Sequence, residues 1–163
     1  MKRILLFGNS GSGKSTLAKR LSREHQLAHL DLDTVAWQPS APTERRSLEE
    51  SWQVILGFVQ GSPAWVIEGC YTDLLEKAAP LSNEMIFLNP PIAVCVANAR
   101  SRPWEAHKYS SKAAQDNNLD MLIDWIKGYT TRTDHFSYAS HLNLYNGYTG
   151  NKQMITENES HVR

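Results

Sequence analysis

The strongest chemical signal in the sequence is a glycine-rich segment near its start. Residues 8–15 read Gly-Asn-Ser-Gly-Ser-Gly-Lys-Ser, which satisfies the G-x-x-x-x-G-K-[ST] pattern of a phosphate-binding loop. Glycines let such a loop curl until successive backbone N–H groups point inward and form a nest for an anion. We therefore predict that eight residues bind nucleotide phosphates: Gly8, Ser10, Gly11, Ser12, Gly13, Lys14, Ser15 and Thr16.

Two side chains of this loop carry the expected chemistry. Lys14 would reach the β- and γ-phosphates of ATP, and the Ser15 hydroxyl would be a ligand of Mg²⁺. The alternative is a flexible glycine turn that only connects a strand to a helix. A buried apolar run before the loop and an amphipathic helical pattern after it favour phosphate binding. ATP and Mg²⁺ are thus the expected cofactors.

A pair of carboxylates, Asp31 and Asp33, follows the second expected strand. Residues i and i+2 of a strand project to the same face, so the two side chains are expected to converge. Asp31 would hold a Mg²⁺ water, and Asp33 would accept the proton of a substrate hydroxyl. The alternative is two solvated loop carboxylates.

A third carboxylate, Glu68, ends another expected strand and precedes Gly69. It is either a second group of the acceptor or magnesium site, or a simple turn residue. Asn89 stands where a Walker B motif places an aspartate. Because an amide brings no charge, Asp33 or Glu68 must take that role if the protein is a catalyst.

Arginines are expected because phosphoryl transfer is catalysed mainly by positioning and charge stabilisation. Arg100 and Arg102 stand at the start of a polar segment, residues 101–118, which we predict to be a mobile loop or a small lid. One or both would neutralise the charge of the transferred group, since a guanidinium suits phosphate. The alternative is ordinary solvated surface charge.

The residues with these candidate roles need a scaffold that gathers them at one edge. Apolar runs predict strands at residues 4–7, 28–32, 65–67 and 85–88, with a weaker signal at 153–156. Helical patterns alternate with them at 17–21, 48–59, 92–100 and 119–126, the second opened by a capping box at Ser47 and Glu50. Residues 38–42 are expected to be loop, because Pro39 and Pro42 flank small residues. The alternation predicts a three-layer α/β fold with a parallel sheet, formed by residues 1–163 as a single domain.

Composition narrows the function classes. Lys plus Arg and Asp plus Glu both number 17 in 163 residues, and this balance argues against a dedicated nucleic-acid binder. The two cysteines lack CxxC spacing, so neither a disulfide framework nor a thiolate zinc site is expected. The N-terminal apolar run is too short for a signal peptide, and no run approaches the roughly 20 residues that cross a bilayer. We expect a cytoplasmic protein.

Several segments together carry a family resemblance: GNSGSGKSTLAKRL, HLDLDTVAW, WVIEGCY and IFLNPP. Residues 1–102 resemble adenylate-kinase-like P-loop proteins, closest to the DNA topology modulation group, which is related to adenylate and shikimate kinases. The resemblance implies a five-stranded parallel sheet in the order 2-3-1-4-5, Glu68 beside the phosphate loop, ATP as donor and a lid with arginines after Arg100. The sequence departs from the pattern at Asn89, at Cys70 in place of asparagine, and in ending at Arg163, before the final helix that such folds usually have.

The leading hypothesis is an ATP-dependent phosphotransferase that acts on a small molecule. A hydroxyl acceptor would need a general base such as Asp33, whereas a nucleoside monophosphate is already ionised and would need arginines. The sequence offers both sets of residues. The alternatives are a nucleotide-binding regulatory protein without efficient transfer, and a nucleic-acid-associated ATPase. No membrane partner is expected, and the sequence leaves the oligomeric state open.

Overall fold

The structure is a computed structural model that describes residues 1–158, with residues 41–43 described by their backbone only. The strands are β1 (Arg3–Gly8), β2 (Ala28–Asp31), β3 (Trp37–Gln38), β4 (Ala41–Arg45), β5 (Trp65–Gly69), β6 (Glu84–Leu88) and β7 (Asn151–Ile155). The helices are α1 (Lys14–His25), α2 (Asp33–Ala36), α3 (Leu48–Gly61), α4 (Thr72–Ala78), the 3₁₀ turn η1 (Ala79–Leu81), α5 (Ile92–Ser101), α6 (Lys112–Asn117), α7 (Leu119–Lys127) and α8 (Tyr138–Gly147).

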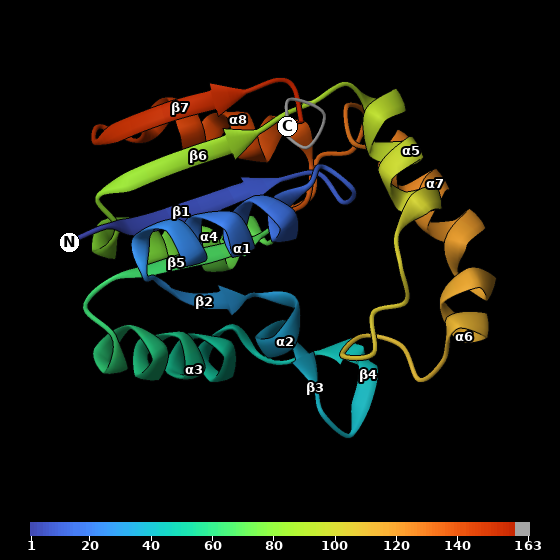
Figure 1. Ribbon diagram of the computed structural model, residues 1–163, viewed down its shortest axis with the longest axis horizontal. Coiled ribbons are helices and arrows are strands. Elements are labelled where there is room, and N and C mark those ends of the chain that lie inside the picture. The colour runs from blue at the N-terminus through green and yellow to red at the C-terminus, as the bar shows by residue number, and fades with distance from the viewer. Residues whose placement is uncertain (159–163) are drawn as a thin grey trace.

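Five of the strands form one parallel sheet in the order β2-β5-β1-β6-β7 (Figure 1). Counted along the chain within this sheet, the order is 2-3-1-4-5, so the predicted topology is confirmed. The central strand β1 pairs with β5 on one side and β6 on the other, and Leu6 lies opposite Glu68 and Ile86. The carboxyl ends of all five strands therefore meet at one edge of the sheet, where parallel sheets bind ligands.

Helices cover both faces of the sheet, which makes the predicted three layers. Ile4 and Leu6 of β1 pack with Leu17 and Ala18 of α1 on one face. Leu5 and Phe7 face the other way, into a larger cluster with residues of α3, α4 and α8. The strand reads as a continuous apolar run because it is buried on both sides.

Three further helices, α5, α6 and α7, lie beyond the carboxyl ends of the strands (Figure 1). Cys95 and Ala99 of α5 pack against Ile126 of α7 in a small cluster of their own. The polar segment 101–118, predicted as a loop or lid, contains the short helix α6, whose first turn is capped by the Ser111 side chain. It remains a prediction that this segment is a lid and that the chain is one domain.

The structure differs from the prediction at residues 38–42. Instead of a plain loop, β3 and β4 pair as an antiparallel hairpin. Prolines are compatible with this arrangement because both strands of a two-stranded ribbon are edges, where a missing N–H is tolerated. The short helices α2, α4 and α8 had no prediction. The capping box at Ser47 and Glu50 is confirmed, with both of its hydrogen bonds formed.

No helix in residues 1–158 is long and apolar enough to cross a membrane. The expectation about the end of the chain at Arg163 concerns residues that lie outside the described part.

Candidate active site

The phosphate-binding loop adopts a conformation that only glycine accommodates at two positions. Gly11 and Gly13 have φ of +76° and +97°, in the left-handed region that side chains disfavour. A Cβ on Gly11 would also lie 2.4 Å from the carbonyl oxygen of Cys95, and one on Gly8 would lie 2.2 Å from that of Leu88. The loop is therefore packed tightly against α5 and the end of β6.

Side-chain amides brace this loop from outside. Asn98 Nδ2 on α5 donates to the Gly11 carbonyl at 2.8 Å and to Asn158 Oδ1 at 2.7 Å. Asn158 Nδ2 donates in turn to the Ser12 carbonyl at 2.8 Å. Both asparagines also belong to the wall of a pocket of about 850 Å³ at the carboxyl ends of β6 and β7. The carbonyl oxygens of Gly11 and Ser12 are thus hydrogen-bonded to side chains outside the loop.

Lys14 and Ser15 are the first two residues of α1. Lys14 Nζ donates to the Asn9 carbonyl at 2.7 Å, so the amine lies back over the loop. Ser15 Oγ donates to Glu68 Oε2 at 2.8 Å. His29 Nε2, on β2, lies 3.1 Å from the same oxygen. Glu68 is only 2% exposed, and these two partners explain how a carboxylate is accommodated there.

The oxygen set at Ser15 fits a magnesium ion that arrives with a nucleotide. Mg²⁺ prefers oxygen ligands and is usually held by one or two carboxylates together with substrate phosphates. Ser15 and Glu68 supply such oxygens. Within residues 1–158 no cluster of three or more His, Cys, Asp or Glu side chains could hold a metal without a substrate. No hydrogen bond joins Asp31 to Ser15, so the metal role of Asp31 stays a prediction.

Asp31 and Asp33 converge, but not for the predicted reason. Strand β2 ends at Asp31, and Asp33 is already the first residue of α2, so the two are not alternate residues of one strand. The Asp33 backbone N–H instead donates to Asp31 Oδ1 at 2.9 Å, a local turn in which an aspartate side chain stands in for a backbone acceptor. A lysine completes the arrangement: Lys108 Nζ lies 2.6 Å from Asp33 Oδ2 and 3.7 Å from Asp31 Oδ2.

Asp33 is held on its other oxygen by a chain of aromatic donors. The Tyr71 hydroxyl donates to Asp33 Oδ1, and Trp37 Nε1 donates to that hydroxyl at 2.9 Å. The Arg45 guanidinium lies 4.9 Å from the Tyr71 ring centre and pairs with Asp73 at 3.3 Å. The carboxylate is thus fixed in orientation, with Oδ2 directed to Lys108.

The two aspartates have pKa values moved in opposite directions. Burial raises the pKa of Asp31, and the charges of Glu68 and Asp33 raise it further. Burial also acts to raise the pKa of Asp33, but the Lys108 charge and the hydrogen bonds from Lys108 and Tyr71 outweigh it, so the pKa is lowered. Paired carboxylates whose pKa values are separated by their surroundings are typical of sites that transfer protons.

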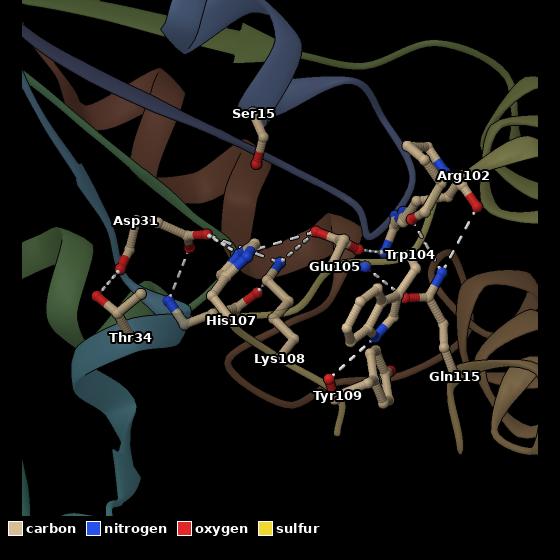
Figure 2. Close-up of polar contacts among 12 residues, drawn as sticks. Ser15, Asp31, Thr34, Arg102, Trp104, Glu105, His107, Lys108, Tyr109 and Gln115 are labelled. Carbon is tan, nitrogen blue, oxygen red and sulfur yellow. Dashed lines mark hydrogen bonds and ion pairs between the residues drawn. The ribbon is translucent and has the colours of Figure 1, made fainter. Parts of the chain in front are cut away.

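The two candidate arginines, Arg100 and Arg102, are not partners of Asp31 or Asp33. Arg102 Nη1 binds Glu105 Oε1 at 3.1 Å, as Figure 2 shows, and Arg100 is exposed on α5. Both line a small pocket with Tyr109 and Gln115. The structure does not bring either guanidinium to the phosphate loop, so their catalytic role stays a prediction.

Asn89 extends the backbone pairing between the ends of β6 and β7. Its backbone N–H donates to the Ile155 carbonyl at 2.6 Å, beyond the last paired residues of β6 and β7. The carboxylate beside the phosphate loop is instead Glu68, as the resemblance implied.

Sequence reasoning missed several residues of the site. His29 had no assigned role, although its place two residues before Asp31 puts it on the same face of β2. Tyr71 and Lys108 had no assigned role. No local pattern pointed to Lys108, because its partners Asp31 and Asp33 lie more than 70 residues away in the chain.

Comparisons with known proteins agree with the fold. No family model matches the chain, and neither does any curated protein sequence. A sugar kinase from Janibacter sp. HTCC2649 is 18% identical over 78% of this chain and 95% of its own, with a TM-score of 0.47. A shikimate kinase from Bacteroides thetaiotaomicron is 17% identical over 89% and 97%, with a TM-score of 0.48. An uncharacterized protein from Eubacterium ventriosum ATCC 27560 is 14% identical over 96% and 89%, with a TM-score of 0.50.

At such identities a likeness concerns the fold alone. The fold itself is a three-layer α/β fold, with a five-stranded parallel sheet and a glycine-rich loop between β1 and α1. The comparisons do not reach the DNA topology modulation group, so that part of the resemblance stays a prediction.

Proposed function

We propose that this protein is an ATP-dependent phosphotransferase that acts on a small molecule. The observation that carries the proposal is the placement of two differently built carboxylate sites side by side. Glu68 binds Ser15 at the phosphate loop, and Asp33 is oriented by Tyr71. Glu68 lies on β5, and Asp33 follows the neighbouring strand β2, whose last residue Asp31 is in register with Glu68. A donor site and an acceptor site thus share one edge of the sheet.

The donor side would hold the phosphates of ATP. The inward N–H groups of the loop and the Lys14 amine bind the β- and γ-phosphates, after the amine leaves the Asn9 carbonyl. Ser15 and Glu68 would hold Mg²⁺ directly or through water. When bound, this ion would offset the negative charge of the phosphates.

The acceptor side favours a hydroxyl. Asp33 accepts the proton of the hydroxyl, and the freed oxygen forms a bond to the γ-phosphorus while the bond between that phosphorus and the β–γ bridging oxygen breaks. The products are a phosphorylated acceptor and ADP. A nucleoside monophosphate would need free arginines instead, and the Arg102 guanidinium is engaged by Glu105.

The test is ADP release from Mg-ATP by the purified protein. Small alcohols, sugars and sugar acids form one set of acceptors, and nucleoside monophosphates form the other. Lys14→Ala removes the phosphate contact, and Lys19→Ala, exposed on the same helix, is its matched control. We expect stimulation by a hydroxyl compound that Lys14→Ala abolishes and Lys19→Ala retains.

Two other outcomes would change the conclusion. Stimulation by nucleoside monophosphates alone would keep the phosphotransferase and overturn the hydroxyl acceptor. ATP binding by calorimetry without stimulation by any acceptor would overturn the proposal in favour of a nucleotide-binding regulatory protein.

A further inference from the structure

The segment from Arg102 to Tyr109 is folded into a compact turn before it meets the sheet. The backbone N–H groups of Lys108 and Tyr109 donate to the Glu105 carbonyl at 2.9 and 3.0 Å. Trp104 Nε1 donates to the Tyr109 carbonyl at 3.0 Å, and the Gln115 side chain binds the Glu105 N–H at 2.8 Å. The segment therefore has a defined shape of its own, which fixes the direction of its charged side chains (Figure 2).

Two basic side chains of this turn, His107 and Lys108, connect it to the strand ends. His107 Nε2 lies 3.7 Å from Asp31 Oδ2, and Lys108 Nζ lies 3.7 Å from the same oxygen and 2.6 Å from Asp33 Oδ2. Figure 2 shows Lys108 and His107 directed toward Asp31, with Glu105 beside them. These contacts join residues more than 70 positions apart, from the polar segment to β2 and α2.

The same turn contains a carboxylate, Glu105, that lies beside both of these side chains. Glu105 binds Arg102 at 3.1 Å through Oε1, and its Oε2 lies 3.5 Å from Lys108 and 3.9 Å from His107. Lys108 is only 21% exposed, so its charge is partly removed from water and depends on Asp33, Asp31 and Glu105. Burial alone would lower the pKa of Lys108, but Asp33 and Asp31 raise it, so the ammonium stays charged.

The Lys108 ammonium lies beside the Asp33 oxygen that an acceptor would use. Tyr71 already uses Asp33 Oδ1, so Oδ2 is the oxygen left for an acceptor hydroxyl. At 2.6 Å, Lys108 takes one of the two lone-pair places on this oxygen and crowds the other. An acceptor hydroxyl would therefore compete with Lys108 for Asp33 Oδ2.

We propose that Lys108 is a latch that closes the segment 102–109 over the acceptor site by occupying Asp33. The inference rests on the proposed function for the identity of the displaced group. The latch itself is a property of the free protein. The segment must release Lys108 from Asp33 before the acceptor binds, and the released ammonium remains nearby on the same turn.

Hydrogen exchange of the free protein tests the latch without any substrate. In Lys108→Met, which keeps the length of the side chain but not its charge, we expect amides of residues 104–109 to exchange roughly tenfold faster, equivalent to about 1.4 kcal/mol. Lys112→Met is the matched control, because Lys112 is exposed and pairs with Asp116 inside α6 at 3.0 Å. That variant should exchange as the wild type does in residues 104–109.

A pair of variants shows whether Asp33 is the partner. Asp33→Asn should speed exchange in the same amides, and the double variant Asp33→Asn/Lys108→Met should add little to either change. Added salt should speed exchange in the wild type, since it screens the ion pair, and should have little effect in Lys108→Met. Unchanged exchange in Lys108→Met, or fully additive effects in the double variant, would overturn the latch.

Kinetics add a second readout once the ADP-release assay has identified an acceptor. A latch competes with the acceptor, so Lys108→Met should lower the acceptor KM about threefold or more without raising the KM for ATP. A fall in kcat with an unchanged acceptor KM would overturn the latch and make Lys108 a catalytic cation instead. If no acceptor stimulates the wild type, the proposed function fails, while the exchange experiment still decides the latch.

Discussion

The Ser15 hydroxyl donates to a buried oxygen of Glu68 at 2.8 Å, which joins the start of α1 to the end of β5. His29 approaches the same oxygen at 3.1 Å from β2. Three elements therefore meet at one carboxylate oxygen beside the phosphate loop. Because Asn89 cannot supply a negative charge at the end of β6, Glu68 is the carboxylate best placed to influence a cation bound at Ser15.

Replacing this carboxylate should change the magnesium requirement more than the fold. Glu68→Gln keeps the size and an oxygen acceptor for Ser15, but removes the charge. We expect the Mg²⁺ concentration that half-saturates ADP release to rise about tenfold or more. The measurement is a Mg²⁺ titration at fixed ATP, with a thermal melt to confirm folding.

Asp31→Asn is the comparison for this titration, since Asp31 was the other predicted magnesium residue. If Asp31→Asn raises the Mg²⁺ requirement and Glu68→Gln does not, the assignment to Glu68 is wrong.

Two glycines should respond to alanine in opposite ways. Gly11 has φ of +76° and a Cβ there would meet the Cys95 carbonyl, so Gly11→Ala strains the loop. We expect the free energy of unfolding to fall by about 1–3 kcal/mol and ATP binding to be lost. Gly57 lies inside α3, and a Cβ there would meet nothing within 4 Å. Gly57→Ala should stabilise by up to about 1 kcal/mol.

Urea unfolding and ATP calorimetry measure both effects. Equal stability of Gly11→Ala and the wild type would mean that the loop relaxes freely, contrary to the tight packing against α5.

The sheet could be predicted from sequence because its signals are local. The run at residues 4–7 is apolar throughout since both faces of β1 are covered, and the loop that follows has a fixed spacing. The hairpin of β3 and β4 could not be predicted, because its strands have two and five residues and β4 contains a proline. Such short strands owe their existence to pairing rather than to their own sequence.

The part of the site that lies at strand ends could be predicted from the sequence. Glu68 and Asp31 end neighbouring strands, so their approach follows from the topology. The orientation of Asp33 does not, since it depends on Tyr71 and Trp37 from other elements. The position of Lys108 depends on a turn whose shape comes from Glu105 and Gln115, and no periodic pattern encodes that turn.

The aspartate pair gives a prediction on stability against pH. The pKa of Asp31 is raised in the folded state above its ordinary 3.8, so the protonated carboxyl favours the fold and stability is lost as pH rises from 3.8 through the folded pKa. Asp31→Asn should therefore melt higher than the wild type at pH 7, by about 2–4 °C for each kcal/mol, with the difference vanishing below pH 3.8.

Asp33→Asn should do the reverse. Its lowered pKa means that ionised Asp33 stabilises the fold above pH 3.8, and this contribution is lost as pH falls through the folded pKa. Melting curves at pH 7 and pH 3 measure both variants. Destabilisation of both at pH 7 would contradict the opposite signs.

The buried side chain of His141 should make the protein less stable at acid pH. His141 is fully buried, with Nδ1 2.7 Å from the Tyr129 hydroxyl and Nε2 2.8 Å from the Cys70 carbonyl. Burial lowers the pKa of His141 to about 4, from an ordinary 6.5. The unfolded chain therefore takes up a proton at His141 below pH 6.5, while the folded protein does not until about pH 4. Stability should fall over that window by about 1.4 kcal/mol for each pH unit from this group alone.

His141→Phe removes the titration but also two hydrogen bonds. It should lose about 1–3 kcal/mol at pH 7.5, because the Tyr129 hydroxyl and the Cys70 carbonyl are left without this partner. Its stability should then decline less steeply than that of the wild type from pH 6.5 to 4, so that the two curves approach each other. Urea unfolding across this range measures the difference, and His25→Phe, on the exposed end of α1, is the control that should keep the wild-type slope. Parallel curves for His141→Phe and the wild type would mean that His141 titrates alike in the folded and unfolded states, and that the acid sensitivity comes from the carboxylates instead.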